Sequence, residues 1–178
     1  MSFSRPKKKV YTEGELYEYA VGALARRMRS VAELKRLLRL KVEAETEFGR
    51  TLVELIIRKL KDQGYLNDSQ YAAAYSSFRR DNEKFGRMRV ITDLKAKGVH
   101  PDLIDAAVTA AFDEVNEEKQ ARAYLQRKRL VRPKDQKQAA RIFRNLTRAG
   151  FRAKTIFTIL KKWDIDDQTL TALEESTE

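Results

Sequence analysis

The chain has 178 residues, of which 42% are hydrophobic and 35% charged, and its formal net charge is +11. The absence of cysteine and the presence of only one histidine, His100, exclude disulfides and thiolate or histidine-rich metal sites. No apolar run approaches the roughly 20 residues of a membrane span, and no hydrophobic stretch follows the basic start MSFSRPKKKV, so we expect a cytoplasmic protein without membrane contact.

The basic residues are unevenly distributed along the chain. Residues 1–9 contain four basic residues and no acid, and residues 119–163 contain fifteen basic residues and one acid, Asp135. Residues 164–178 contain six acids and no base. The positive charge therefore belongs to one short arm and one module. Few glycines and prolines, with abundant Ala, Leu, Lys, Arg and Glu, favour helices throughout.

Three helices are expected in the first third of the chain, after an arm at 1–12 that shows no periodicity. Apolar residues at spacings of three and four predict a helix from Glu13 to Arg29, with Met28 on its apolar face. Ser30 and Glu33 have the spacing of a capping box and predict the start of the next helix. A third helix is expected near 48–63.

The next helix contains an aromatic series. Asn67 or Asp68 is expected to cap it, and Tyr71, Tyr75 and Phe78 fall at i, i+4 and i+7, which is typical of core residues. Its exposed surface would consist mainly of polar side chains: Ser69, Gln70, Ser76 and Ser77.

A charged elbow leads from this helix into the following one. Gly86 is expected to relieve backbone strain there, and a helix with Met88, Ile91 and Leu94 facing inward would follow. Pro101 suits the first position of the helix after it.

The last third of the chain predicts three more helices. One begins near Glu117, Pro133 is expected at the first position of the second, and the third runs from Lys154 to Trp163. The pattern Leu-x-x-x-Gly followed by an apolar residue occurs three times, ending at Gly64, Gly98 and Gly150. This pattern is typical of a helix end with a left-handed glycine, after which the apolar residue folds back.

Together these signals predict an all-α chain of nine helices in three groups of three. The expected organisation is a basic arm (1–12), three helical repeats (13–66, 67–116 and 117–163) and an acidic tail (164–178). Tandem helical repeats stack into a solenoid, so we expect an elongated, curved, right-handed array.

Catalytic and cofactor motifs are missing. No glycine is followed by Lys and then Ser or Thr, as a phosphate-binding loop requires, and the single histidine has no partner for a hydrolytic triad. We therefore expect no enzyme activity, no catalytic residue, no metal site and no cofactor.

The basic residues offer the remaining candidate chemistry, in two clusters. Charge runs are usually solvated faces, but a dense arginine-rich segment also suits the phosphates of a polyanion. The elbow is read equally well as an exposed turn or as a docking ridge. The candidate binding residues are Arg79, Arg80, Lys84, Arg87 and Arg89 in the elbow, and Arg127, Lys128, Arg129, Arg132, Arg141, Arg144 and Arg148 in the third repeat.

The pattern of residues in the central segment resembles that of a known family. The run Gly64-Tyr65-Leu66-Asn67-Asp68-x-x-Tyr71-Ala72, then Arg79, then Gly86-x-x-Arg89-x-x-x-x-Leu94-x-x-x-Gly98-Val99 is similar to the signature of RecX, the regulator of the RecA recombinase. Leu24-x-Arg26-Arg27-x-x-Ser30-x-x-Glu33-Leu34 and Leu146-x-Arg148-x-Gly150-Phe151 extend the resemblance over about residues 15 to 163. Asn67 stands where the family often has aspartate, and Lys41 where a glycine often ends the first repeat.

This resemblance implies a fold and a function. RecX proteins are built from three tandem three-helix repeats, bind the RecA filament on single-stranded DNA, and suppress filament extension, ATP hydrolysis and strand exchange without catalysis of their own. By resemblance we expect a monomer whose partners are the RecA filament and single-stranded, or also double-stranded, DNA. The alternative is a stand-alone DNA-binding protein of helix-turn-helix type, which would read bases through a recognition helix.

Overall fold

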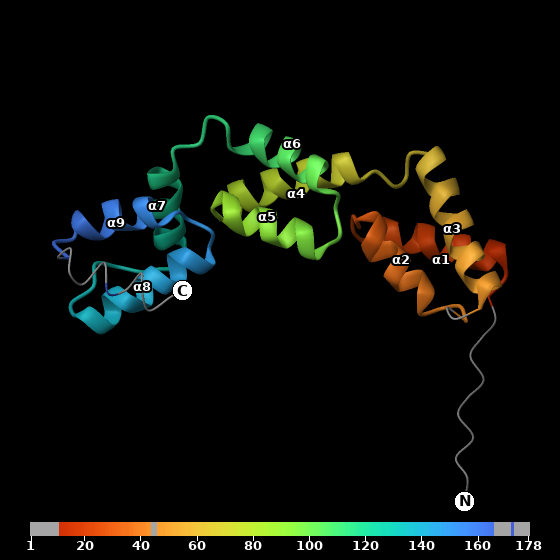
Figure 1. Ribbon diagram of the computed structural model, residues 1–178, viewed down its shortest axis with the longest axis horizontal. Helices are drawn as coiled ribbons and strands as arrows, with labels where there is room; N and C mark the ends of the chain where they lie inside the picture. Colours follow the sequence, from red (N-terminus) through yellow and green to blue (C-terminus); the bar gives the residue numbers. More distant parts are fainter. Residues whose placement is uncertain (1–10, 44–45, 166–171, 173–178) are drawn as a thin grey trace, which may run out of the picture. The chain divides into compact units, whose positions relative to one another are not determined.

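The computed structural model of the chain describes residues 11–43 and 46–165, together with Ala172. Over these residues it contains nine helices and no strand (Figure 1), which confirms the all-α prediction. Most of the predicted arm and acidic tail lies outside the described residues. No helix in the described part is long and apolar enough to cross a membrane.

The chain divides into two compact units. Unit 1 comprises the described residues up to Tyr71 together with Lys97–His100, and unit 2 comprises Ala72–Ala96 and the described residues from Pro101 onward. Unit 1 contains α1 (Glu13–Arg26), α2 (Val31–Arg39) and α3 (Glu47–Asp62), which all pack on one another. Their shared core contains Leu16, Leu34, Leu38, Ile56 and Leu60, each with no exposed surface.

Local sequence signals start the helices of unit 1. Thr12 caps α1 in a capping box with Glu15, and Ser30 caps α2 in a capping box with Glu33, as predicted. Each box satisfies backbone N–H groups that have no partner within their own helix. Thr46 caps α3 with its side-chain oxygen.

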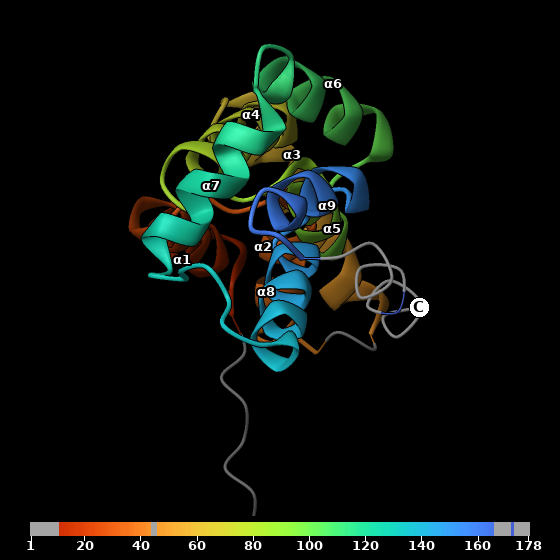
Figure 2. The ribbon, with the colours of Figure 1, turned by 90° about the vertical axis from the view of Figure 1, so that its left-hand side faces the viewer.

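Unit 2 contains the remaining helices apart from the start of α4 (Asp68–Asp81). They are α5 (Arg87–Ala96), α6 (Pro101–Phe112), α7 (Glu117–Arg127), α8 (Gln136–Arg148) and α9 (Ala153–Lys161). Helix α5 packs on α6. Helix α9 packs on both α7 and α8, and these three helices lie together in Figures 1 and 2. The core of this last group includes Ala121, Leu125, Leu146, Ile156 and Leu160.

The three predicted glycine stops are confirmed by their backbone angles. Gly64, Gly98 and Gly150 have φ values of +76°, +73° and +87°, a region that residues with a Cβ rarely adopt. At the last stop, the N–H of Phe151 donates to the carbonyl of Leu146 at 3.2 Å, the bond expected of a Schellman end. At the first stop Tyr65 does not fold back as predicted: it is exposed, and Leu66 is buried in its place.

Several expected helix boundaries are wrong by a few residues. Helix α1 ends at Arg26 rather than Arg29, because the backbone of Arg27 is extended, and Met28 is therefore exposed. Pro133 is not the first residue of α8, since Asp135 caps that helix with its side chain. Pro101 does begin α6, as predicted.

The periodicity also misplaced some side chains. Tyr71 is buried, but Phe78 is 53% exposed, because the side of α4 that faces inward bears Ala72 and Ser76. Ser76 was expected on the surface and is fully buried. On α5, Met88 is exposed and Val90 occupies the core.

The start of α2 forms hydrogen bonds with two other segments of unit 1. The Ser30 hydroxyl donates to the carbonyl of Lys97 at 2.6 Å, and the N–H of Val31 donates to Asp68 Oδ1 at 2.8 Å. A Cβ on Gly98 would overlap the Cβ of Ala32. The carbonyl of Lys97 is thus satisfied by the Ser30 side chain at the beginning of α2.

The start of α5 makes an equivalent junction within unit 2. The N–H groups of Gly86 and Met88 donate to the carbonyls of Ala149 (2.8 Å) and Gly150 (3.2 Å). A Cβ on Gly86 would overlap the carbonyl of Gly150, and a Cβ on Gly150 would overlap the backbone of Arg89. Gly86 is therefore required by close approach to the end of α8, and not by the backbone strain that the sequence suggested.

Candidate nucleic-acid and partner interface

Two arginines of the predicted elbow converge on one carboxylate of α5. Arg79 Nη2 lies 3.2 Å from Asp93 Oδ2, and Arg89 Nε lies 3.0 Å from Asp93 Oδ1. Tyr75 donates to Asp93 Oδ2 at 3.0 Å and accepts from Arg79 Nε at 2.8 Å. Both guanidinium groups also lie over the ring of Phe85, at 5.2 and 5.6 Å. Burial raises the pKa of Tyr75, which keeps its hydroxyl protonated as a donor.

Arg80 joins α4 to α6. Its Nη1 donates to the carbonyl of Ala111 at the end of α6, and its Nε lies 2.7 Å from Asp81 Oδ1. Its own carbonyl accepts from Gln120 Nε2 of α7 at 2.6 Å. Arg80 therefore connects three helices of unit 2.

The other basic residues near the elbow are also held within unit 2. Arg87 Nη2 donates to Thr109 Oγ1 of α6 at 2.9 Å, and Arg127 pairs with Glu83 at 3.0 Å. Lys84 is half-buried and has a positive φ of 58°. The structure thus brings Arg127 to Glu83 of the elbow, and the arginines of the elbow all have acidic or polar partners in the fold.

The connection between α7 and α8 is basic and largely exposed. Lys128 lies over the ring of Tyr124 at 5.9 Å, and Arg132 pairs with Asp164 at 2.5 Å. Arg129 is exposed in the left-handed region, with φ of 53°, and forms no ion pair with any described residue. Val131, which lies between Arg129 and Arg132 in the sequence, is 74% exposed.

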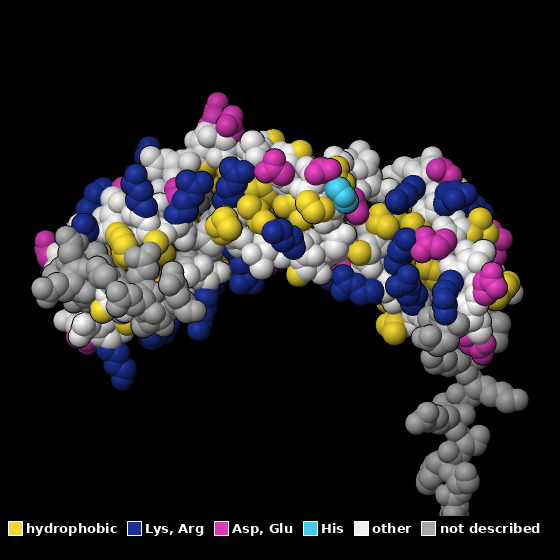
Figure 3. Space-filling model, in the orientation of Figure 1, with side chains coloured by type: hydrophobic (Ala, Val, Ile, Leu, Met, Phe, Trp, Pro, Cys, Tyr) yellow, Lys and Arg dark blue, Asp and Glu magenta, His cyan; other side chains and the backbone are white. Residues whose placement is uncertain are grey.

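Helix α8 carries a separate line of cations, which we call the basic stripe: Lys137, Arg141, Arg144 and Arg148. Intervals of four, three and four residues place these side chains on one helix face. All four are exposed, and within the described part of the chain none forms an ion pair. The opposite face of α8 bears the buried residues Ala139, Ile142, Phe143 and Leu146. Figure 3 shows Lys and Arg side chains over this α7–α9 region.

Lys137 is the member of the stripe that sequence reasoning missed. It lies in the first turn of α8, where the positive end of the helix dipole disfavours a cation by some tenths of a kcal/mol. No acid occupies that first turn. The signal that could have found Lys137 is its spacing of four from Arg141, which the helix predicted from Pro133 already contained.

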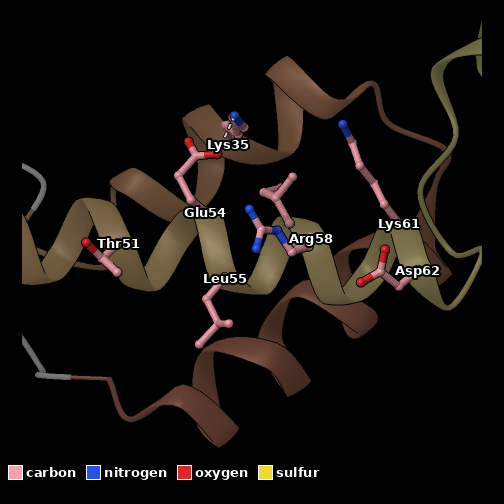
Figure 4. Close-up of a pocket in the computed structure, with 8 residues that line it drawn as sticks. Lys35, Thr51, Glu54, Leu55, Arg58, Lys61 and Asp62 are labelled. Atoms are coloured by element: carbon pink, nitrogen blue, oxygen red, sulfur yellow. Dashed lines mark hydrogen bonds and ion pairs between the residues drawn. The ribbon is translucent and has the colours of Figure 1, made fainter.

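No group of three or more potential metal ligands occurs among the residues that the structure describes. A hollow in unit 1, on the outer side of α3 next to α2, has a volume of about 410 Å³. Lys35, Glu54, Arg58 and Lys61 line it together with apolar Leu55 (Figure 4). Charged and apolar groups in a shallow hollow suit a macromolecular surface better than a small apolar ligand.

Comparison with known proteins decides the family. Residues 67–108 match the family model for the second three-helix domain of RecX. Regulatory protein RecX of Deinococcus radiodurans is 33% identical over 161 residues, which cover 89% of this chain and 72% of that protein. Regulatory protein RecX of Trichlorobacter lovleyi is 30% identical over 151 residues, which cover 83% of this chain and 95% of that protein. The chain belongs to the RecX family.

Other RecX proteins are longer than this chain. Regulatory protein RecX of Bacillus velezensis is 30% identical over 161 residues, but the match covers only 59% of that protein. The chain thus spans little more than half the length of this relative. These relatives are named as regulatory proteins, and the chain belongs to their family.

Solved RecX structures share the fold. The crystal structure of RecX from Lactobacillus salivarius matches with a TM-score of 0.60 at 21% identity, over 85% of this chain and 96% of that one. A second crystal structure of a regulatory protein RecX matches with a TM-score of 0.59 at 24% identity, over 84% of this chain and 73% of that one. These likenesses agree with an array of three three-helix repeats.

Proposed function

We propose that this protein is a non-enzymatic regulator that binds the RecA filament on single-stranded DNA and inhibits its recombinase, ATPase and coprotease activities. Family membership supports a regulatory role. The observation that carries the proposal is the basic stripe of α8, four exposed cations on one face without an ionic partner among the described residues. In this proposal the protein acts as a monomer.

The geometry of the stripe suits a phosphate backbone. Its first and last members are eleven residues apart, or about 16 Å at 1.5 Å per residue, and three of the four are arginines, whose planar forks match phosphate oxygens. Four like charges on one face repel one another unless a polyanion neutralises them. Lys128 and Arg129, in the connection that precedes α8, add two exposed positive charges to this part of the chain.

The elbow has a different place in the proposal. Arg79 and Arg80 already have partners that tie α4 to α5 and α6, and Arg89 ties α5 to the end of α8. Moving them to a phosphate would break those contacts, whereas the stripe can bind without any rearrangement. We therefore propose that α8 makes the first contact with DNA. The elbow, predicted to contact recombinase or DNA, is then the candidate for recombinase contact.

The ATPase activity of RecA on single-stranded DNA tests this function. The protein, added at or below the molar amount of recombinase and with DNA sites in large excess, is expected to lower the rate of ATP hydrolysis. Excess DNA is the control against simple coating, which would not inhibit when few sites are covered. An unchanged rate under these conditions would contradict the proposal.

A stand-alone helix-turn-helix reader is the rival function. It needs base-reading side chains on an exposed recognition helix, yet Ser76, one of the four polar residues expected on that surface of α4, is buried. Sequence-specific footprints on duplex DNA without recombinase would favour this rival.

A further inference from the structure

Helix α3 presents an unusual outward face in unit 1. Phe48, Thr51, Leu55, Arg58 and Asp62 recur at intervals of three and four residues, so they share one side of the helix; we call this line the outer stripe. All five are exposed, and two are large apolar residues, Phe48 at 71% and Leu55 at 45% exposure. The opposite side of α3 bears Val53, Ile56 and Leu60, which fill the core of unit 1. Core packing therefore does not explain the apolar residues of the outer stripe.

Charged groups flank the outer stripe on the side of α2. Lys35 of α2 pairs with Glu54 at 2.7 Å across the rim of the hollow. In Figure 4, Glu54 and Lys61 project toward the side on which Lys35 lies, and Leu55 points the opposite way. Arg58 and Lys61 form no ion pair with any residue that the structure describes. The hollow therefore offers two cations that a carboxylate could approach.

The composition of this face distinguishes it from the basic stripe. Two carboxylates, Glu54 and Asp62, line the hollow beside the cations, so the face lacks the continuous positive charge that suits a row of phosphates. Because Glu54 is paired with Lys35, Arg58 and Lys61 outnumber Asp62 and leave a small positive excess that suits a single carboxylate. Figure 3 shows basic, acidic and hydrophobic side chains interspersed over unit 1. An exposed aromatic and an aliphatic residue beside an unpaired arginine are typical of the centre of a protein–protein interface.

We propose that the outer stripe of α3 is a docking surface for an acidic segment of a protein partner. The segment places a carboxylate against Arg58 and Lys61 and an apolar side chain against Phe48 and Leu55. This assignment rests on the proposed function, in which the partner is the recombinase filament. It divides the tasks: α8 contacts DNA, and α3 contacts protein.

Two variants test the surface independently. Phe48→Ser with Leu55→Ser removes the apolar contact, and Arg58→Glu reverses the charge; because all three residues are exposed, both variants should keep the fold. Each is expected to weaken binding to RecA assembled on single-stranded DNA by about tenfold or more. Binding to bare single-stranded DNA should not change. Both affinities are measured by fluorescence anisotropy or by sedimentation of the filament.

Matched controls come from unit 1. Met28→Ser removes an apolar residue of similar exposure outside α3, and Arg26→Glu reverses an exposed arginine of α1; both should bind the filament like the unchanged protein. If the α3 variants bind the filament as tightly as the unchanged protein does, the inference is wrong but the proposed function stands. The same holds if the variants lose as much affinity for bare DNA as for the filament, since DNA would then be the occupant. If the unchanged protein binds the filament no better than bare DNA, the inference falls together with the proposed function.

Discussion

At the scale of single residues, Glu33 connects local capping to tertiary contacts. Its carboxylate accepts from the Ser30 N–H at 3.2 Å and from the Tyr71 hydroxyl at 3.1 Å, and it pairs with Lys97 at 3.0 Å. Partial burial alone would raise the pKa of Glu33, but Lys97 and the hydrogen bonds outweigh it and hold the pKa below 4.5. The charged form is therefore stabilised in the folded protein.

This lowered pKa predicts a loss of stability in acid. A carboxylate with a lower pKa in the folded than in the unfolded state contributes fully above the unfolded value of about 4.5 and loses that contribution as the pH falls through its folded pKa. Glu33→Gln should lower the free energy of unfolding by about 1–2 kcal/mol at pH 7, with a smaller difference at pH 3. Urea unfolding at both pH values measures this.

Glu54→Gln serves as the control for Glu33. Glu54 also pairs with a lysine, but it is 54% exposed, and surface pairs contribute little. A pH dependence of unfolding as large for Glu54→Gln as for Glu33→Gln would contradict the argument.

At the scale of elements, α8 combines a structural and a functional face. Ile142, Phe143 and Leu146 hold it to the core of unit 2, and Arg141, Arg144 and Arg148 lie on the other side. Exposed substitutions that leave the buried face intact usually change stability by less than about 0.5 kcal/mol. Binding and folding can therefore be separated on this helix.

The triple variant Arg141→Glu, Arg144→Glu, Arg148→Glu should weaken binding to single-stranded DNA and flatten its salt dependence. Each lost phosphate contact lowers the slope of log K against log salt by about 0.7, so three contacts give a change of about 2. Titrations at several salt concentrations measure it.

A control with the same change of net charge separates local contact from overall charge. Arg26, Arg27 and Arg39 are exposed in unit 1, and their triple reversal to Glu should leave the salt slope nearly unchanged. If the slope of log K against log salt falls by the same amount in both triple variants, the stripe is not the DNA site.

At the scale of the whole molecule, two junctions have the same form. In each, the residues that begin one helix contact a glycine that ends another helix. Ser30 and Ala32 meet Lys97 and Gly98 in unit 1, and Gly86 meets Gly150 in unit 2. In repeat proteins, stability depends on such nearest-neighbour junctions as well as on each repeat.

Three glycine-to-alanine variants should separate the contributions at the junction. Gly150→Ala imposes both a left-handed residue and an overlap with Arg89, and should lower the free energy of unfolding by about 1–3 kcal/mol. Gly64→Ala places an alanine in the same left-handed region but in open space, and should lower the free energy of unfolding by less. Gly22→Ala lies inside α1 with nothing nearby, and should gain about 1 kcal/mol. Thermal and urea unfolding measure the order, and a loss at Gly64 equal to that at Gly150 would contradict the role of the junction.

The helices were largely predictable because their signals are local. The capping box of Ser30 and Glu33 and the glycine stops operate over a few residues, and the structure confirms them. Periodicity failed at Phe78 and Met88, since it cannot tell which side of a helix the neighbouring helices will cover. The basic stripe was partly predictable for the same local reason; the helix predicted from Pro133 already contained Lys137 four residues before Arg141, but this spacing was not used.

The sequence by itself determined an all-α chain, its three glycine stops, the RecX resemblance and the concentration of positive charge near α8. Only the tertiary structure decided which cations remain available. Asp93, Ala111 and Glu83 supply partners for the elbow and Arg127, whereas the described residues supply none for the arginines of the stripe. Charge is a property of composition, but its availability depends on which distant groups the fold brings within hydrogen-bonding distance.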